Sequence, residues 1–84
     1  MKLLGHLAAG NPPLKAIRNL EIGTSSTTVN HDLMTAHGYR AMPDVVIPVV
    51  RSASDAVTVI VEDVDRETIT LKATGDCVVD VYYG

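Results

Sequence analysis

The sequence of 84 residues contains no Trp and no Phe, and its only large aromatic side chains are those of Tyr39, Tyr82 and Tyr83. Large rings supply much of the core of most small domains, so the core of this chain must consist of aliphatic side chains. Cys77 is the single cysteine, which excludes an internal disulfide. A chain of this length buries only about 60% of the surface that it exposes when unfolded. We therefore expect subunit association to complete its stability.

Other absences exclude whole classes of partner. The net charge of −3 argues against a nucleic-acid binder, because such proteins neutralise phosphates with an excess of Lys and Arg. No apolar run reaches the roughly 18–20 residues that a membrane-spanning helix needs. A hydrophobic content of 46% is also too high for a chain that is disordered throughout. We expect a folded domain whose partner is neither nucleic acid nor a membrane.

β-Branched residues are abundant, and they favour strands over helices. There are 12 Val, 5 Ile and 8 Thr, so 25 of the 84 residues are β-branched. Apolar and polar residues alternate in segments 56–63, 67–73 and 77–83, which is the period of a half-buried strand. The links at 64–66 and 74–76 are short and polar. We therefore predict three consecutive antiparallel strands that form a meander.

Three further strands are predicted upstream. Segment 44–50 is rich in Val and Ile, and Pro48 within it indicates an edge strand or a bulge, because Pro cannot donate to a strand ladder. Segments 16–22 and 26–30 are weaker candidates, and in the first of them Ile17 does not share the parity of Leu20 and Ile22. Residues 31–42 are predicted to form a loop. The fold class is thus all-β, a small antiparallel β-sandwich or open barrel of about six strands.

The first fifteen residues differ from the rest and are predicted to form an extended N-terminal arm, with the β-sandwich domain at 16–84. Residues 1–30 carry a net charge of +2, whereas 31–84 carry −5. Leucines outside the sheet need a partner surface, so the arm either folds back to cap one end of the sandwich or docks between neighbouring subunits. The partner-binding residues predicted for the arm are Leu3, Leu4, Leu7, Leu14 and Lys15.

No arrangement of residues typical of catalysis or of metal binding occurs in the sequence. His6, His31 and His37 lack the spacing that places two imidazoles on one metal. The acidic run at 63–67 lacks the glycine and the distal glutamate of a calcium loop. The serines lie in predicted turns, none beside a base, and Cys77 is predicted to be a small buried hydrophobe. We therefore predict no catalytic residue, no metal, no cofactor and no enzyme activity.

Tyr82 and Tyr83 are neighbours at the end of the last predicted strand. Adjacent residues on a strand point to opposite faces, so one tyrosine should face the core and the other should face outward. The outward tyrosine is a candidate contact for another subunit or for a sugar ring. The alternative is that both tyrosines only cover strand ends.

Five segments resemble the sequences of small virion proteins of tailed bacteriophages. They are 29–33 (VNHDL), 42–47 (MPDVVI), 57–59 (VTV), 64–71 (VDRETITL) and 79–84 (VDVYYG). In these segments the chain is similar to the trimeric β-sandwich modules of tail fibres and to H-type lectins. It also resembles the capsid decoration, or cement, proteins that lie as trimers on icosahedral heads. The resemblance spans about two-thirds of the chain and brings no catalytic residue with it.

Among these families, the decoration proteins best match a short chain with an N-terminal arm. The resemblance therefore implies a decoration protein that is made in the host cytoplasm and binds as a homotrimer on the outer surface of the phage head. Its partner would be the major capsid protein, and its role would be to stabilise the shell. The alternative is a glycan- or receptor-binding tail appendage like the H-type lectins, and a scaffolding or adaptor protein is a third interpretation.

Overall fold

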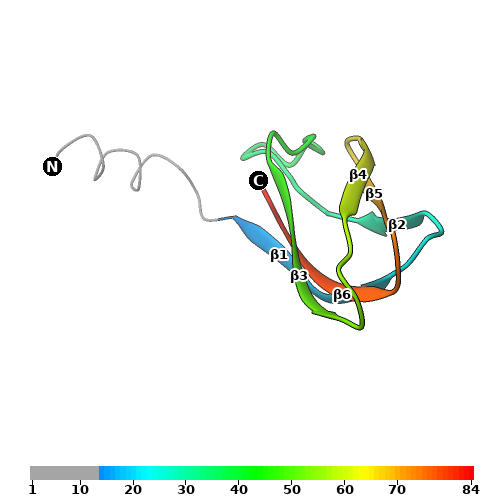
Figure 1. The fold of residues 1–84 in the computed structure, drawn as a ribbon. Helices are drawn as coiled ribbons and strands as arrows, with labels where there is room; N and C mark the ends of the chain where they lie inside the picture. Colours follow the sequence, from blue (N-terminus) through cyan, green and yellow to red (C-terminus); the bar gives the residue numbers. More distant parts are fainter. Residues whose placement is uncertain (1–13) are drawn as a thin grey trace, which may run out of the picture.

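The computed structural model describes residues 14–84, and within that range it contains six strands and no helix. The strands are β1 (Lys15–Ile22), β2 (Thr27–Asn30), β3 (Val46–Ala53), β4 (Val59–Val64), β5 (Thr68–Ala73) and β6 (Cys77–Tyr83). They form two three-stranded antiparallel sheets, in the orders β1-β6-β3 and β2-β5-β4, which pack against each other (Figure 1). The predicted small all-β sandwich is confirmed. Residues 14–84 hold no helix of the length and apolarity that spanning a bilayer requires.

The connection between β5 and β6 crosses from one sheet to the other, so the predicted three-stranded meander is wrong. β4 and β5 do form the expected hairpin, in which Val64 is opposite Ile69. β6, however, lies between β1 and β3. The physical reason is that β2 and β4 already occupy both edges of β5, whereas the centre of the other sheet lets β6 pair along both of its edges.

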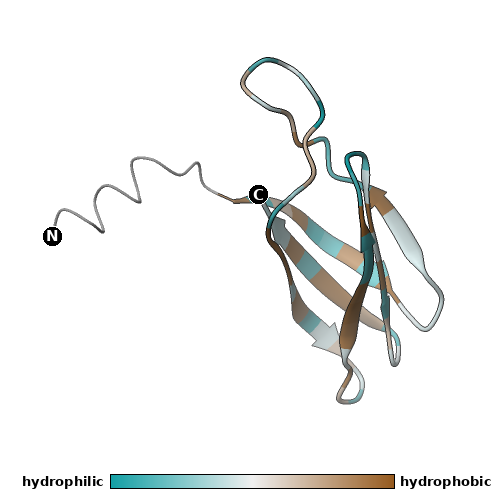
Figure 2. Cartoon of the chain, turned by 90° about the horizontal axis from the view of Figure 1, so that it is seen from above, coloured by the Kyte–Doolittle hydropathy of each residue, from teal (hydrophilic) through white to brown (hydrophobic). Residues whose placement is uncertain are grey.

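The core lies between the sheets and is built mainly from the inward residues of β5 and β6. Figure 2 shows hydrophobic and hydrophilic residues alternating along the strands, as the sequence predicts. Cys77 is buried, also as predicted. The buried apolar side chains are Ile22, Ile69, Leu71, Ala73, Cys77, Val79, Val81 and Tyr83. All of them except Ile22 belong to β5 or β6, the central strands of the two sheets, and partly buried side chains of the other four strands pack against them.

A buried polar pair lies at one end of this core. His31, just after β2, is 1% exposed, and Tyr83, at the end of β6, is 5% exposed. The Tyr83 hydroxyl donates to the His31 carbonyl oxygen over 2.6 Å. The His31 Nδ1 accepts from the Leu33 N–H over 3.0 Å, which leaves Nε2 to donate to the Asp65 carbonyl oxygen over 2.7 Å. His31 thus joins β2, β6 and the β4–β5 turn, and its burial was not anticipated from its place in a loop.

β3 lies at an edge of its sheet, as Pro48 predicted, with Pro48 opposite Val81 in the ladder. The backbone after Pro43 continues this edge beyond the strand. Asp44 and Val45 both donate their N–H groups to the Gly84 carbonyl oxygen, over 2.9 and 3.1 Å. These bonds fix the end of the 31–45 loop beside the end of β6, where Figure 1 places the C-terminus.

Candidate functional site

A carboxylate lies in the middle of the outer face of the β1-β6-β3 sheet, the face that points away from the core. Asp80 belongs to β6, and its side chain is only 3% exposed although it points outward. Arg18 of β1 places Nη1 at 3.6 Å from Asp80 Oδ2, and Arg51 of β3 places Nε at 3.5 Å from the same oxygen. The two arginines therefore cover the carboxylate from both neighbouring strands.

An irregularity in β1 produces the first of these contacts. The register with β6 shifts between Ile17 and Leu20, so that two residues, Arg18 and Asn19, lie opposite Asp80. Asn19 has a φ of 56°, and its N–H donates to Asp80 Oδ1 over 2.9 Å. Such a bulge adds one residue to a strand and redirects the side chains around it. It also explains why Ile17 breaks the parity of this strand in the sequence.

A second irregularity, in β3, produces the other contact. The register shifts between Val50 and Ser52, which leaves Arg51 as the additional residue. From this position on β3, Arg51 reaches Asp80 on the neighbouring strand β6. Bulges are enriched beside functional sites, where they aim a particular side chain. Two bulges that flank one carboxylate, each supplying an arginine, make this surface the candidate functional site.

We name this surface the arginine face and define it by Arg18, Ile47, Val49, Arg51, Asp80 and Tyr82. Ile47 and Val49 are opposite Tyr82 and Asp80 in the ladder, and they are 45% and 39% exposed. The Arg18 guanidinium lies 5.7 Å from the centroid of the Tyr82 ring, within the range of a cation–π contact. Arg and Tyr dominate the binding energy of protein–protein interfaces, and apolar residues fill the space around them.

The ion pairs of this face hold the arginines in place more than they stabilise the fold. The side chains of Arg18 and Arg51 are 63% and 60% exposed, so solvent screens their attraction to Asp80. Each guanidinium has five N–H donors, of which the contacts with Asp80 and Tyr82 use only a part. The remaining donors can hold a carboxylate of a ligand through two parallel hydrogen bonds. The face therefore suits a protein surface that offers carboxylates beside apolar side chains.

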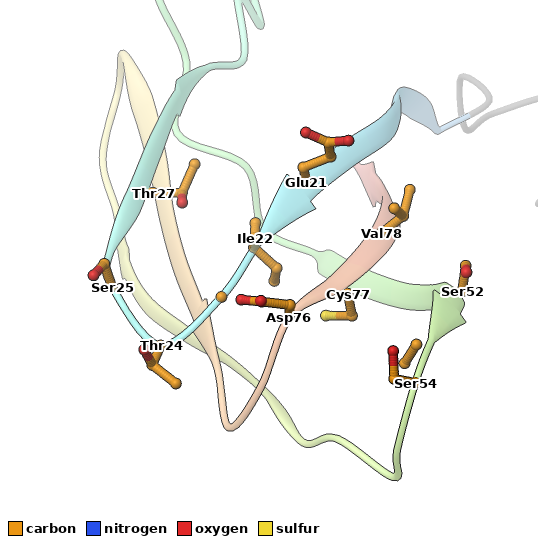
Figure 3. A pocket seen from close by; sticks show the side chains of 12 residues that line it. Glu21, Ile22, Thr24, Ser25, Thr27, Ser52, Ser54, Asp76, Cys77 and Val78 are labelled. Atoms are coloured by element: carbon orange, nitrogen blue, oxygen red, sulfur yellow. The ribbon is translucent and has the colours of Figure 1, made fainter.

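A second feature is an open pocket at the Cys77 end of β6, with a volume of about 670 Å³ (Figure 3). Asp76 points into it beside the β1–β2 turn, where its carboxylate lies so close to Gly23 that a Cβ there would be 2.6 Å from Oδ1. Ser52 and Ser54 lie on the opposite side from Thr24 and Ser25 (Figure 3). The polar side chains that line this hydroxyl-lined pocket are Glu21, Thr24, Ser25, Thr27, Ser52, Ser54 and Asp76.

Hydroxyl and carboxylate groups can exchange hydrogen bonds with a small polar molecule such as a sugar. None of the described residues of the pocket is aromatic, so the pocket offers no ring on which a sugar could stack. Tyr82 lies on the arginine face, near the opposite end of β6 from Cys77. Within residues 14–84 no three side chains of the metal-binding types come together. The pocket and the outward tyrosine are therefore separate features.

The residues singled out in the sequence are dispersed in the structure. Tyr83 is buried, so it is not an exposed contact, and Tyr82 is the tyrosine that faces outward, as strand geometry requires. Lys15, assigned to the arm, is instead the first residue of β1, where it pairs with Tyr83. Leu14 is 45% exposed. Outside the described residues lie the other arm positions, Leu3, Leu4 and Leu7.

Of the arginine face, sequence reasoning found only Tyr82. Arg18, Arg51 and Asp80 lie on three different strands, and their approach depends on a strand order that alternation alone does not specify. The one local signal was the broken parity at Ile17, which indicates a bulge and thus a redirected side chain nearby.

Comparisons of this chain with protein-family models, with curated proteins and with solved structures find no match. The resemblance to bacteriophage virion proteins therefore stays a prediction. The function of the chain has to be argued from its own residues and surfaces.

Proposed function

We propose that the protein is a structural assembly protein, and more specifically a capsid decoration protein that binds as a homotrimer to the major capsid protein on the outer surface of a phage head. The arginine face supports the assembly role, because it combines exposed Ile47 and Val49 with arginines that are already held in position. The segments that resemble bacteriophage virion proteins support the choice of a capsid as the partner.

In this proposal the protein acts mechanically, by bridging neighbouring subunits of an assembled shell. A protein that binds only the assembled state stabilises that state by mass action. Asp80 and Tyr82 already restrict the arginines, so these long side chains lose less conformational freedom when they bind. The part of the predicted arm that precedes β1, residues 1–14, would add a second contact with the shell or with a neighbouring copy.

The test combines the mass of the protein in solution, measured by light scattering, with co-sedimentation on shells that lack it. We expect the mass of three chains and saturable binding. Val49→Glu places a charge on the arginine face and should weaken binding to the shell about tenfold or more. Met42→Glu is the matched control, because Met42 is also exposed but lies in the 31–45 loop. Unchanged binding by Val49→Glu, or a stable monomer, would contradict the proposal.

The hydroxyl-lined pocket favours a second function of a different class, a glycan- or receptor-binding tail appendage. Its hydroxyls and the carboxylate of Asp76 supply the hydrogen-bonding groups that recognise sugars. A glycan array with the purified protein separates the two functions. A specific hit that is lost in Asp76→Ala but kept in Val49→Glu would favour the appendage, and a hit lost in Tyr82→Ala would place the sugar on the arginine face.

A further inference from the structure

The turn between β4 and β5 gathers exposed carboxylates on the sheet that does not carry the arginine face. We name this segment the acidic hairpin and define it by Glu62, Asp63, Asp65 and Glu67, all of them exposed. Over residues 62–67 the net charge is −3. Two cations outside the segment reach its acids, since Lys72 Nζ lies 3.6 Å from Glu62 Oε2 and Arg40 Nε lies 3.9 Å from Glu67 Oε1. Asp63 makes no salt bridge with any residue in the range 14–84.

Buried and local hydrogen bonds hold the acidic hairpin in one shape. His31 donates from its backbone N–H to the Glu67 carbonyl oxygen over 3.1 Å and from Nε2 to the Asp65 carbonyl oxygen over 2.7 Å. Asp65 Oδ1 accepts from the N–H groups of Thr68 and Glu67, over 2.6 and 2.7 Å. These backbone bonds, led by that from Thr68, lower the pKa of the Asp65 carboxyl. A surface fixed in this way loses little freedom on binding.

We propose that the arginine face of one copy binds the acidic hairpin of a second copy of this chain. The inference rests on the proposed function, because it names the contact through which the proposed homotrimer forms. Arg18 and Arg51 carry donors that Asp80 does not use, and Asp63 supplies an exposed carboxylate that no cation within residues 14–84 pairs. The apolar part of the β4 surface is Ile60, which is 41% exposed. Ile60 lies opposite Lys72 in the ladder, and the Lys72 ammonium is paired with Glu62.

The two surfaces belong to different sheets of the same chain, so the contact is head-to-tail. Each copy offers its arginine face to one neighbour and its acidic hairpin to the next. Contacts of this kind form a ring if the rotation between copies closes, and an open filament if it does not. A closed ring of three copies uses every arginine face and every acidic hairpin, which gives a limit to the assembly. The trimer then binds the shell through other surfaces, and Val49→Glu weakens shell binding by dissociating the trimer.

A simpler explanation of the acids is that they protect a free sheet edge. β4 is an edge strand, and charged residues on such strands keep them from pairing with other chains. That explanation predicts that removing the acids promotes aggregation, whereas a head-to-tail contact predicts that it promotes dissociation. The two outcomes are opposite in sign.

The experiment measures the self-association of the full chain by sedimentation equilibrium, at low and at high salt. Asp63→Lys reverses one exposed charge of the acidic hairpin, and Asp55→Lys makes the same change at an exposed acid between β3 and β4. We expect Asp63→Lys to raise the dissociation constant about tenfold or more at low salt, and less at high salt. Asp55→Lys should associate like the wild type. Circular dichroism shows that each variant is folded.

The arginine face is tested with a variant that leaves no buried carboxylate without a partner. Arg18→Gln, Arg51→Gln and Asp80→Asn together remove the charges and keep an acceptor for the Asn19 N–H. This triple variant should weaken association as Asp63→Lys does. Adding Asp63→Lys to it should cost little more, because changes to two surfaces in contact are not additive. Additive effects would overturn the pairing of the two surfaces.

The outcomes separate this inference from the proposed function. If the wild type associates and neither charge variant affects it, the inference is wrong and the homotrimer stands. Larger aggregates of Asp63→Ala, which removes the charge from the edge and does not replace it, would also overturn it, in favour of edge protection. Dissociation only on changing Leu3, Leu4 and Leu7 to Ser would assign the contact to the N-terminal residues instead. A wild-type chain that stays monomeric at every concentration would refute the homotrimer itself.

Discussion

Tyr83→Phe tests whether the polar pair at the end of the core carries part of the stability. The substitution keeps the buried ring and removes one hydroxyl, so it opens no sizeable cavity. That hydroxyl donates to the His31 carbonyl oxygen over 2.6 Å, in a region where His31 is 1% and Tyr83 is 5% exposed. The variant therefore leaves a buried carbonyl group without this donor.

The size of the effect follows from the burial of the acceptor. A buried polar group that loses its hydrogen-bond partner costs about 1–3 kcal/mol, more than the net value of a typical hydrogen bond. We expect Tyr83→Phe to lower the free energy of unfolding by about 2 kcal/mol. This loss is a large part of a total stability of about 5–15 kcal/mol. In a domain of this size it lowers Tm by roughly 10 °C.

The assay is urea unfolding followed by circular dichroism, at one fixed protein concentration so that self-association contributes equally to every variant. Tyr82→Phe is the matched control, because it removes the same atom from the adjacent residue. The Tyr82 hydroxyl lies on the outer face and only accepts a long contact of 3.5 Å from Arg18 Nη1. The control should change the free energy of unfolding by less than about 0.5 kcal/mol.

Alkaline pH provides a second measurement of the same hydrogen-bonded hydroxyl. Burial, and to a lesser degree the charge of Asp32, raises the pKa of Tyr83 above its ordinary value of 10.0. The stability that this shift contributes is complete below the ordinary pKa and is lost as the pH rises through the higher pKa of the folded state. Tyr83→Phe should therefore lose less stability than the wild type in that range. If Tyr83→Phe and Tyr82→Phe were equally stable, and if their free energies of unfolding fell equally with rising pH, the role given to the His31–Tyr83 pair would be refuted.

Three other substitutions test separate parts of the structure by the same unfolding assay. Asp80→Asn keeps an acceptor for the Asn19 N–H, whereas Asp80→Ala does not, so Asp80→Ala should be less stable than Asp80→Asn by about 1–2 kcal/mol; equal stabilities would contradict the role given to that bond. The pKa of Asp65 is lowered from 3.8, so the stability that its carboxylate contributes is present above that pH and is lost as the pH falls through the lower pKa of the folded state. Asp65→Asn should therefore have a lower free energy of unfolding than the wild type at neutral pH and the same one in acid. Gly38 has a φ of 84° with open space around its Cα, so Gly38→Ala should cost only the backbone strain, about 1 kcal/mol, and no change would indicate that the loop relaxes.

Alternation predicted the strands because it depends only on neighbouring residues in one chain. The hairpin of β4 and β5 and the edge position of Pro48 followed from the local properties of turns and of proline. The sheet in which a strand lies is not a local property. β6 alternates in the same way whether it borders β5 or lies between β1 and β3, and only the competition for free edges decides.

The candidate sites were less accessible to sequence reasoning than the fold. Asp80 alternates with buried valines and so is predicted to be an ordinary outward residue, yet it is covered from two sides by arginines distant in the sequence. His31 is one histidine in a polar loop, and nothing beside it shows that the Tyr83 hydroxyl and the Asp65 carbonyl oxygen will enclose it. Both features depend on contacts between segments that are far apart in the chain.

The reason to expect self-association changes once these contacts are known. The lack of Phe and Trp suggested a core too poor to be stable alone. The structure closes one end of that core with the hydrogen-bonded His31–Tyr83 pair, and on the outer face it joins β1 to β6 through the hydrogen bond from the Asn19 N–H to Asp80. Both cross-links meet on β6, the central strand of the β1-β6-β3 sheet. A stable monomer would therefore be compatible with the fold, and what argues for association is instead the exposed arginine face and the rigid acidic hairpin that complements it.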